Sequence, residues 1–253
     1  MNKKFLIFVI LPVVVAGFFV WYFINRSELN DGAGKGDNKV VQFSKEITAD
    51  VKKPDWTWYA TGPCHGLQIA KGKCKGRLVV PINHVEAQTG KNFVHIIYSD
   101  DHGNTWELGD NTPQDGANEV TTAELSDGKL MLNIRNADRK KHTRLYTTST
   151  DGGQTWADIQ TDTTLIEPIC QGSLLNYTLS KNKNVLLFSN PANTKKRANL
   201  TLRLSLDDGH TWPGKEVIFA GPAAYSDISI HKHKQIACVY EAGENNPNEG
   251  IAF

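Results

Sequence analysis

Three aspartates recur in one eight-residue pattern, and their type and spacing are the first feature that could carry chemistry. The pattern is Ser-x-Asp-x-Gly-x-Thr-Trp, with the aspartate at Asp101, Asp151 and Asp207. A turn aspartate accepts hydrogen bonds from backbone amides of its own loop, and the glycine supplies a positive φ. The tryptophan has a large face to pack between sheets. These carboxylates are therefore expected to stabilise turns and not to catalyse a reaction.

Histidine and cysteine, the usual metal-binding side chains, follow no strong ligand spacing. The eight histidines contain no His-x-x-x-His pattern or similar arrangement. Cys64 and Cys74 could close one hairpin but do not match a metal motif. Cys170 and Cys238 lie beside apolar segments, where ordinary buried thiols are expected. No metal site is predicted.

The overall charge balance excludes some partner classes. The formal net charge is +1 at pH 7, which gives no reason to expect a nucleic-acid partner. The basic run Lys195-Lys196-Arg197 is too short for a nucleic-acid patch. Its charge is better suited to an anionic sugar.

The repeat also predicts the elements that position the rest of the chain. Successive copies start 50 and 56 residues apart, and a period near 50 residues is typical of a propeller with one blade per repeat. Short segments rich in Leu, Ile, Val, Thr and Tyr predict strands at 94–100, 120–125, 129–136, 144–149, 173–179, 184–189, 200–205, 227–231 and 236–241. No sustained helical period follows residue 25. The predicted fold class is all-β, with a propeller as the favoured architecture.

The first segment has a different character. Residues 5–24 contain no charge, and a helix of that length spans about 30 Å, the thickness of a bilayer core. Lys3 and Lys4 precede it, which places the N-terminus in the cytoplasm. The alternative is a cleaved signal peptide, whose apolar region is usually about 7–15 residues long. Either interpretation predicts export of the domain, to the periplasmic or extracellular side of a membrane or into the medium.

Composition divides the chain into three parts. Residues 1–25 form the anchor or signal peptide, and the polar, glycine-rich residues 26–47 form a flexible linker. Residues 48–253 form one globular domain, long enough to bury a substantial core.

From Trp56 to Phe253 the chain resembles the exo-α-sialidases, glycoside hydrolases that remove terminal sialic acid. The three aspartate repeats have the family's order, and the other supporting segments are TGPCHGLQ (61–68), GRLVVP (76–81), NE (118–119), MLNIRN (131–136), CQGS (170–173), RANLT (197–201), YSD (225–227) and VYEAGE (239–244). The family fold is a six-bladed β-propeller. The resemblance implies about four of those blades here, which form an incomplete ring.

The resemblance also assigns roles to five residues. Arg135 and Arg197 match two of the family's three arginines that bind the sialic acid carboxylate, and arginine presents a planar fork suited to that group. Tyr225 matches the nucleophile, and Glu119 matches the glutamate that takes the phenol proton. A neutral phenol avoids the repulsion that a carboxylate nucleophile would meet from the substrate's own charge. Glu241 matches the carboxylate that orients the first arginine.

Two family features have no match in this sequence: the first arginine, in an Arg-Ile-Pro segment, and the general-acid aspartate that follows it. Hydrolysis of terminal α-linked sialic acid from glycoconjugates, with retention, is the expected function, and the family implies no metal or organic cofactor. One alternative is a truncated, catalytically incompetent relative that at most binds sialic acid. Another is a propeller that binds only protein partners. The sequence leaves the oligomeric state open.

Overall fold

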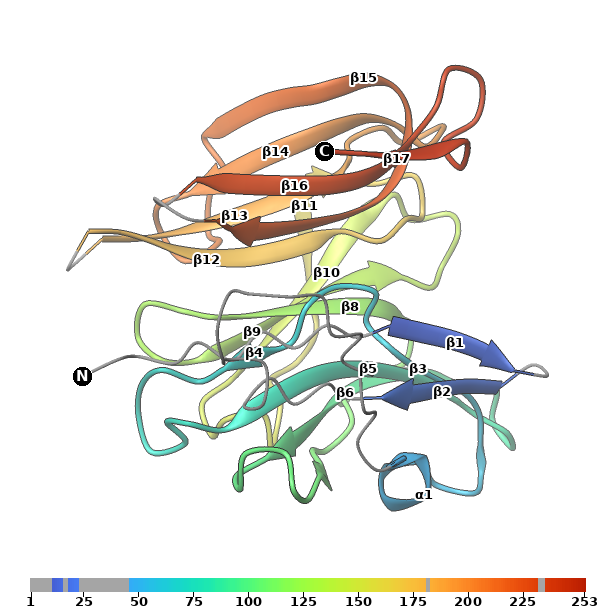
Figure 1. Cartoon of the computed structure of the whole chain (residues 1–253), viewed down its shortest axis with the longest axis vertical. Coiled ribbons are helices and arrows are strands. Elements are labelled where there is room, and N and C mark those ends of the chain that lie inside the picture. Colours follow the sequence, from blue (N-terminus) through green and yellow to red (C-terminus); the bar gives the residue numbers. More distant parts are fainter. Residues whose placement is uncertain (1–10, 16–17, 23–45, 181–182, 232–234) are drawn as a thin grey trace, which may run out of the picture. The chain divides into compact units, whose positions relative to one another are not determined.

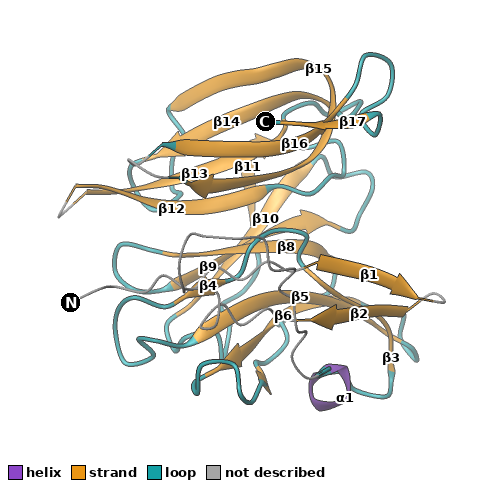
Figure 2. Cartoon of the chain, viewed as in Figure 1, coloured by secondary structure: helices purple, strands orange, loops and turns teal. Residues whose placement is uncertain are grey.

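The computed structural model describes residues 11–15, 18–22, 46–180, 183–231 and 235–253. The chain divides into two compact units, residues 1–53 and residues 54–253. The second unit contains all five candidate site residues and consists of β-strands joined by turns (Figure 2). The predicted all-β class is confirmed.

The second unit contains three antiparallel sheets (Figure 1). The first has the order β3-β5-β6-β7 with β4 beside β5, the second β11-β10-β9-β8, and the third β12-β13-β14-β15-β16-β17. The strands are β3 (Trp56–Thr61), β4 (Leu67–Gln68), β5 (Leu78–Glu86), β6 (Asn92–Ser99), β7 (Glu107–Leu108), β8 (Ala117–Glu124), β9 (Leu130–Asn136), β10 (Thr143–Ser149), β11 (Gln160–Ile166), β12 (Ser173–Ser180), β13 (Lys183–Pro191), β14 (Ala198–Ser205), β15 (Gly214–Ile230), β16 (Ile236–Ala242) and β17 (Gly250–Ala252). Every strand predicted from the sequence is present.

Apolar side chains from neighbouring sheets form the core between them. One buried cluster joins Val79 and Ile96 of the first sheet to Leu132 of the second. Another joins Met131 of the second sheet to Phe188 of the third. Consecutive sheets therefore pack against each other through apolar side chains, which is the packing expected of propeller-like blades.

The aspartate repeats form the turns that the sequence predicts. Asp101 accepts hydrogen bonds from the backbone N–H and the hydroxyl of Thr105, at 2.9 and 2.7 Å. The Ser99 hydroxyl donates to Asp101 and accepts from the N–H of Gly103, whose φ is 90°. The copies at Asp151 and Asp207 repeat these contacts. All three aspartates are thus committed to their own loops.

The long strand β15 belongs to two ladders. Its first half pairs with β14, from Gly214 opposite Leu204 to Pro222 opposite Ala198. Its second half pairs with β16, and the register shifts between Ala223 and Ser226. A register shift of this kind bends a strand and re-aims its side chains. Tyr225 lies within it.

The N-terminal unit differs from the predicted membrane helix. Residues 11–15 (β1, Leu11–Val15) and 18–22 (β2, Phe18–Tyr22) are antiparallel strands, and the short helix α1 spans Thr48–Val51. The β-branched and aromatic residues of this segment, such as Val13–Val15 and Phe18–Tyr22, favour strands. The remaining residues of the predicted helix, and residues 26–45 of the predicted linker, lie outside the described residues. No described helix has the length and apolar character needed to cross a bilayer.

The four cysteines are present as free thiols. Cys64 and Cys74 are half-buried and do not form the bridge that the sequence allows. Cys170 is fully buried, as predicted, whereas Cys238 is only half-buried.

Candidate active site

Tyr225 and Glu119, from different sheets, meet through a hydrogen bond. The phenol oxygen of Tyr225 donates to Oε1 of Glu119. Glu119 lies on β8, where the register against β9 shifts between Ala117 and Val120. Both residues of this predicted nucleophile and base pair therefore sit at strand irregularities, which frequently re-aim side chains beside active sites.

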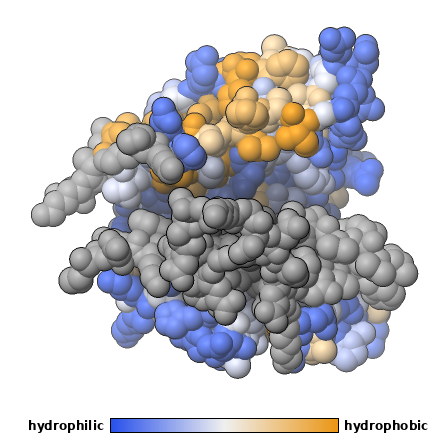
Figure 3. Space-filling view, viewed as in Figure 1, coloured by the Kyte–Doolittle hydropathy of each residue, from blue (hydrophilic) through white to orange (hydrophobic). Residues whose placement is uncertain are grey.

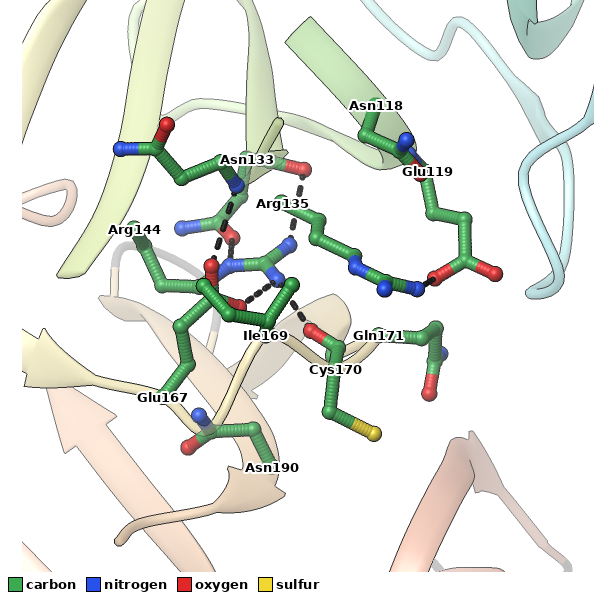
Figure 4. Close-up of polar contacts among 12 residues, drawn as sticks. Asn118, Glu119, Asn133, Arg135, Arg144, Glu167, Ile169, Cys170, Gln171 and Asn190 are labelled. Carbon is green, nitrogen blue, oxygen red and sulfur yellow. Dashed lines mark hydrogen bonds and ion pairs between the residues drawn. The ribbon is translucent and has the colours of Figure 1, made fainter. Parts of the chain in front are cut away.

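Arg135 completes a three-residue contact with this pair. It lies on β9, next to β8 in the sheet, and its Nη1 donates to Oε2 of Glu119 at 2.6 Å. Figure 4 shows the two side chains pointing toward one another. The same nitrogen lies 3.5 Å from the phenol oxygen of Tyr225. The arginine thus contacts both members of the proton-transfer pair.

Arg197 reaches the same phenol ring from another direction. Its guanidinium carbon lies 5.6 Å from the centroid of the Tyr225 ring. Its Nη2 donates to the carbonyl of Ile169 at 3.4 Å, and its own carbonyl accepts from the N–H of Ala223 at 3.0 Å. Within the part of the chain that the structure describes, no carboxylate lies within ion-pair distance of Arg197. This cation is therefore available for an anionic ligand.

Glu241 contacts the backbone of the predicted nucleophile. Its Oε2 accepts a hydrogen bond from the N–H of Tyr225 at 3.1 Å, from the neighbouring strand β16. Among the described residues no arginine forms an ion pair with it. In this structure Glu241 holds the strand that carries Tyr225. The sequence resemblance did not point to that contact.

Burial and charge determine the protonation of the two central groups. Burial raises the pKa of Tyr225, and the charge and hydrogen bond of Glu119 raise it further, although Arg135 acts in the opposite direction. The phenol is therefore protonated at neutral pH. Burial disfavours the charged form of Arg135, but the Glu119 carboxylate outweighs that effect, so the pKa of Arg135 is raised. The site holds a neutral phenol beside a permanent cation.

A neighbouring thiol does not compete with the phenol as a nucleophile. Cys170 is completely buried. Burial is the main reason that its pKa rises to about 12. Since the thiolate is the reactive form, Cys170 is inert at neutral pH.

A buried ion pair that sequence reasoning missed supports the site. Arg144 on β10 pairs with Glu167 at 2.5 Å, and both side chains are essentially inaccessible. Arg144 also donates to Asn133 Oδ1 at 2.8 Å and to the carbonyl of Cys170 at 2.7 Å (Figure 4). An arginine inside a predicted strand needs such a partner if it is buried, and its position in the strand predicted at 144–149 is the signal that could have drawn attention to it. The pair fixes the loop of residues 167–171 against the second sheet.

A cavity of about 600 Å³ lies elsewhere in the second unit. Lys71, Lys73, Cys74 and Lys129 are among its lining residues, and none of the five candidate site residues is. The candidate site is the group of side chains that meet at Tyr225 and not this cavity, because only that group combines a predicted nucleophile with a predicted base.

The sequence and the fold both match known proteins. Residues 35–238 match the model of the BNR repeat-like domain. A sialidase of Micromonospora viridifaciens is 34% identical over 213 residues, which cover 82% of this chain and 32% of that protein. A sialidase of Bacteroides fragilis is 32% identical and is covered to 38% of its length. The chain thus spans about a third of these relatives.

A solved structure gives the same result for the fold. The Hadza microbial sialidase Hz136 superposes with a TM-score of 0.73 at 29% identity, over 89% of this chain and 42% of that one. The family that the motifs predict is confirmed. The chain belongs to the family of BNR repeat-like domains, and its relatives there are sialidases.

Proposed function

We propose that this domain is an exo-α-sialidase that removes terminal α-linked sialic acid from glycoconjugates with retention of configuration. The relatives named sialidases support the reaction class. The observation that carries the proposal is the hydrogen bond from the Tyr225 phenol to Glu119, with Arg135 in contact with both.

The charges around the phenol suit a substrate with a carboxylate on its anomeric carbon. Arg197 has no carboxylate partner among the residues described, and it lies over the Tyr225 ring. Arg135 forms an ion pair with Glu119. Two arginines beside a neutral nucleophile would bind the substrate's carboxylate next to the attacking oxygen. A carboxylate nucleophile in the same place would repel it.

The first chemical step follows from this geometry. The phenol oxygen of Tyr225 forms a bond to the anomeric carbon while the bond from that carbon to the aglycone oxygen breaks. Glu119 accepts the phenol proton, so the attacking group becomes an anion only as it reacts. The aglycone oxygen takes up a proton from solvent. Water then attacks the anomeric carbon and displaces Tyr225, the attacking water gives up one proton to solvent, and the phenol recovers its proton from Glu119.

A reagent with a fluoride leaving group tests the nucleophile directly. Trypanosoma rangeli sialidase holds 2,3-difluorosialic acid as a covalent intermediate. Fluoride leaves without protonation, so the reagent needs no general acid. We expect intact-mass spectrometry of the full chain to show one added 3-fluorosialosyl group, with the modified peptide containing Tyr225.

Two variants and a substrate complete the test. Tyr225→Phe should abolish labelling, because it lacks the attacking oxygen. Arg197→Ala should raise the reagent concentration needed for half-maximal labelling. A fluorogenic sialoside measures turnover by the same protein. Sialic acid binding without labelling of the wild type would leave only a binding role. Absence of both would refute the proposal.

The same protein is proposed to act outside the cytoplasm. The uncharged residues 5–24 behind Lys3 and Lys4 support export, either as an anchor or as a cleaved signal peptide. Membrane fractionation and N-terminal sequencing of the mature protein distinguish the two cases. Recovery of the uncleaved protein in the cytoplasmic fraction would contradict export.

A further inference from the structure

Tyr225 lies where the regular ladder of its strand is interrupted. The pairing of β15 with β16 is out of register between Ala223 and Ser226. Standard strand pairing therefore does not fix the backbone at this point. A nucleophile in this position needs other contacts to hold it, because a displacement of about 1 Å can reduce a rate about 100-fold.

Two side chains contact the backbone here: Glu241 accepts from the N–H of Tyr225, and Gln171 pairs with Ser226. Oε1 of Gln171 accepts from the N–H of Ser226 at 2.9 Å, and its Nε2 donates to the carbonyl of Ser226 at 2.8 Å. A primary amide carries the same donor and acceptor as a peptide group. Gln171 thus pairs with the residue after Tyr225 as a strand neighbour would.

Gln171 is itself held firmly. Its side chain is 1% exposed, and it follows Cys170, whose carbonyl accepts from Arg144. The buried pair of Arg144 and Glu167 anchors the same loop to β9 and β10. Figure 4 shows Ile169, Cys170 and Gln171 of this loop, with a dashed line from the Arg144 side chain to the Cys170 carbonyl. The loop therefore holds the side-chain amide of Gln171 in a fixed position.

The backbone of this loop is in an unusual conformation. Ile169 has a φ of 57°, a region that β-branched residues rarely occupy. Its carbonyl accepts the hydrogen bond from Arg197. Strain of this kind persists only where surrounding contacts impose it, and it is often found at functional sites. One five-residue loop thus contacts Arg197 through Ile169 and the strand of Tyr225 through Gln171.

We propose that Gln171 is a positioning residue, which sets the phenol of Tyr225 against Glu119 and Arg135 by pairing with the backbone of Ser226. The proposal rests on the proposed function of Tyr225. Gln171 acts through Ser226 and does not need to touch the substrate. Its loss should therefore slow the reaction step more than it weakens binding.

The test compares one substitution at two glutamines. Gln171→Met keeps the length of the side chain and removes both hydrogen bonds to Ser226, together with the one from Nε2 to the sulfur of Cys64. Gln114→Met is the matched control, since the Gln114 side chain also contacts a backbone group and accepts a hydrogen bond from the N–H of Ile159 at 2.8 Å. We expect Gln171→Met to lower the maximal rate of labelling by difluorosialic acid about 10- to 100-fold. Half-saturation should change little, and Gln114→Met should leave both values unchanged.

A second variant addresses folding and chemistry together. Gln171→Glu keeps an acceptor for the Ser226 N–H but lacks the amide donor at neutral pH. Protonation of the new carboxyl group at lower pH restores a donor. Its labelling rate, relative to wild type, should rise as the pH falls. A purely structural role predicts a pH-independent deficit that follows thermal stability.

Fluorine NMR decides the proposal even if the chain is not a sialidase. Fluorotyrosine replaces tyrosine, and the Tyr225→Phe spectrum assigns the residue 225 signal. This signal should shift or broaden in Gln171→Met and remain as in wild type in Gln114→Met. An unchanged signal in folded Gln171→Met would overturn the positioning role. Failure of wild-type labelling together with a shifted signal would refute only the proposed function.

Discussion

Glu119 has more influence on the Tyr225 phenol than any other charged residue that contacts it. Its charge and hydrogen bond both raise the pKa of the phenol, in addition to the effect of burial. It also neutralises part of the Arg135 charge through a contact of 2.6 Å. One carboxylate therefore favours the protonated form of the proposed nucleophile and lies where it could accept the phenol proton during the proposed attack.

Glu119→Gln tests this dual role. We expect the turnover of a fluorogenic sialoside to fall about 10²- to 10⁴-fold, the usual contribution of a general base. The pKa of Tyr225 should fall toward its ordinary value, because the carboxylate that raises it is gone while burial remains. Ultraviolet titration of tyrosinate, with Glu119→Gln/Tyr225→Phe as the reference, measures the change. A phenol pKa that stays the same or rises would contradict this assignment.

The buried pair of Arg144 and Glu167 predicts an asymmetric effect on stability. Arg144→Met leaves the Glu167 carboxylate buried without its cation, and removal of one partner of such a pair usually costs about 3–5 kcal/mol. Arg144→Met/Glu167→Met should be less destabilised than Arg144→Met alone. Urea denaturation measures the free energy of unfolding. Lys129→Met, which breaks an exposed pair with Asp127, is the control and should change it little.

At the scale of the turn, the aspartate repeats make the fold sensitive to acid. Hydrogen bonds from the Thr105 N–H, the Thr105 hydroxyl and the Ser99 hydroxyl lower the pKa of Asp101 from 3.8 to about 2. A carboxyl group with a lower pKa in the folded state stabilises the fold above its unfolded pKa. That contribution is lost as the pH falls through the folded value.

Asp101→Asn therefore should flatten part of the acid unfolding curve. The free energy of unfolding of the wild type should decrease as the pH falls from about 4 to about 2, and the variant should show a weaker dependence over that window. Chemical denaturation at a series of pH values provides the comparison. Equal slopes for both proteins would show that the folded turn does not depress this pKa.

Substitutions at two glycines with positive φ allow the stability cost of backbone strain to be measured separately from the cost of crowding. Gly90 has a φ of 67° and open space around its missing Cβ, so Gly90→Ala should cost about 1–2 kcal/mol. Gly153 has a φ of 89°, and an added Cβ would lie 2.2 Å from Cδ1 of the buried Ile96. Gly153→Ala should cost about 1–3 kcal/mol more, from overpacking. Thermal and urea unfolding of both variants measure the difference, and equal effects would contradict the crowding argument.

The alternating apolar strands were predictable from sequence because each buries one face against a neighbouring sheet. Strands β3, β4, β5, β7, β11 and β17 were not predicted, nor was the first half of β15. β5 contains Pro81, and β11 is largely polar, so neither has the usual pattern. The acceptor role of the repeat aspartates was predictable, since the carboxylates of Asp101, Asp151 and Asp207 bond within their own loops.

The support of the site was not predictable in the same way. Arg144 and Glu167 meet across 23 residues of sequence, so their pairing depends on where β10 and the following loop lie in space. The positive φ of Ile169 runs against the preference of a β-branched residue and has no sequence signal. The family motif identified Tyr225, whereas the contacts that hold its backbone depend on how distant parts of the chain meet in the fold.

At the scale of the whole second unit, one face of the last sheet is markedly apolar. Ile251 is 70% exposed and Val239 is 48% exposed, and the register places both on one face of β16 and β17, whereas the exposed Ile230 and Ile236 lie on the other face. Figure 3 shows apolar residues gathered in the region of β15–β17, in the upper part of the view. Contiguous surfaces of this kind promote association.

Ile251→Lys should reduce that association. A charge on β17 opposes stacking of two apolar faces, and the side chain is too exposed to contribute much to the core. Static light scattering over a concentration series should show a lower apparent mass for this variant than for wild type, with an unchanged melting temperature. Ile251→Leu is the control and should behave as wild type. Identical scattering by all three proteins would show that this face does not drive self-association.

The shared strand β15 links the integrity of the chain's last hairpin to reactivity. The first half of β15, from Gly214 to Pro222, pairs with β14. The second half, which carries Tyr225, pairs with β16. A protease that trims β17 and then β16 would free this stretch while the first two sheets, with Glu119 and Arg135, stay folded. Covalent reactivity of the phenol would disappear well before the circular dichroism of the body changed. The reactivity of the Tyr225 phenol would therefore depend on whether β16 and β17 are folded.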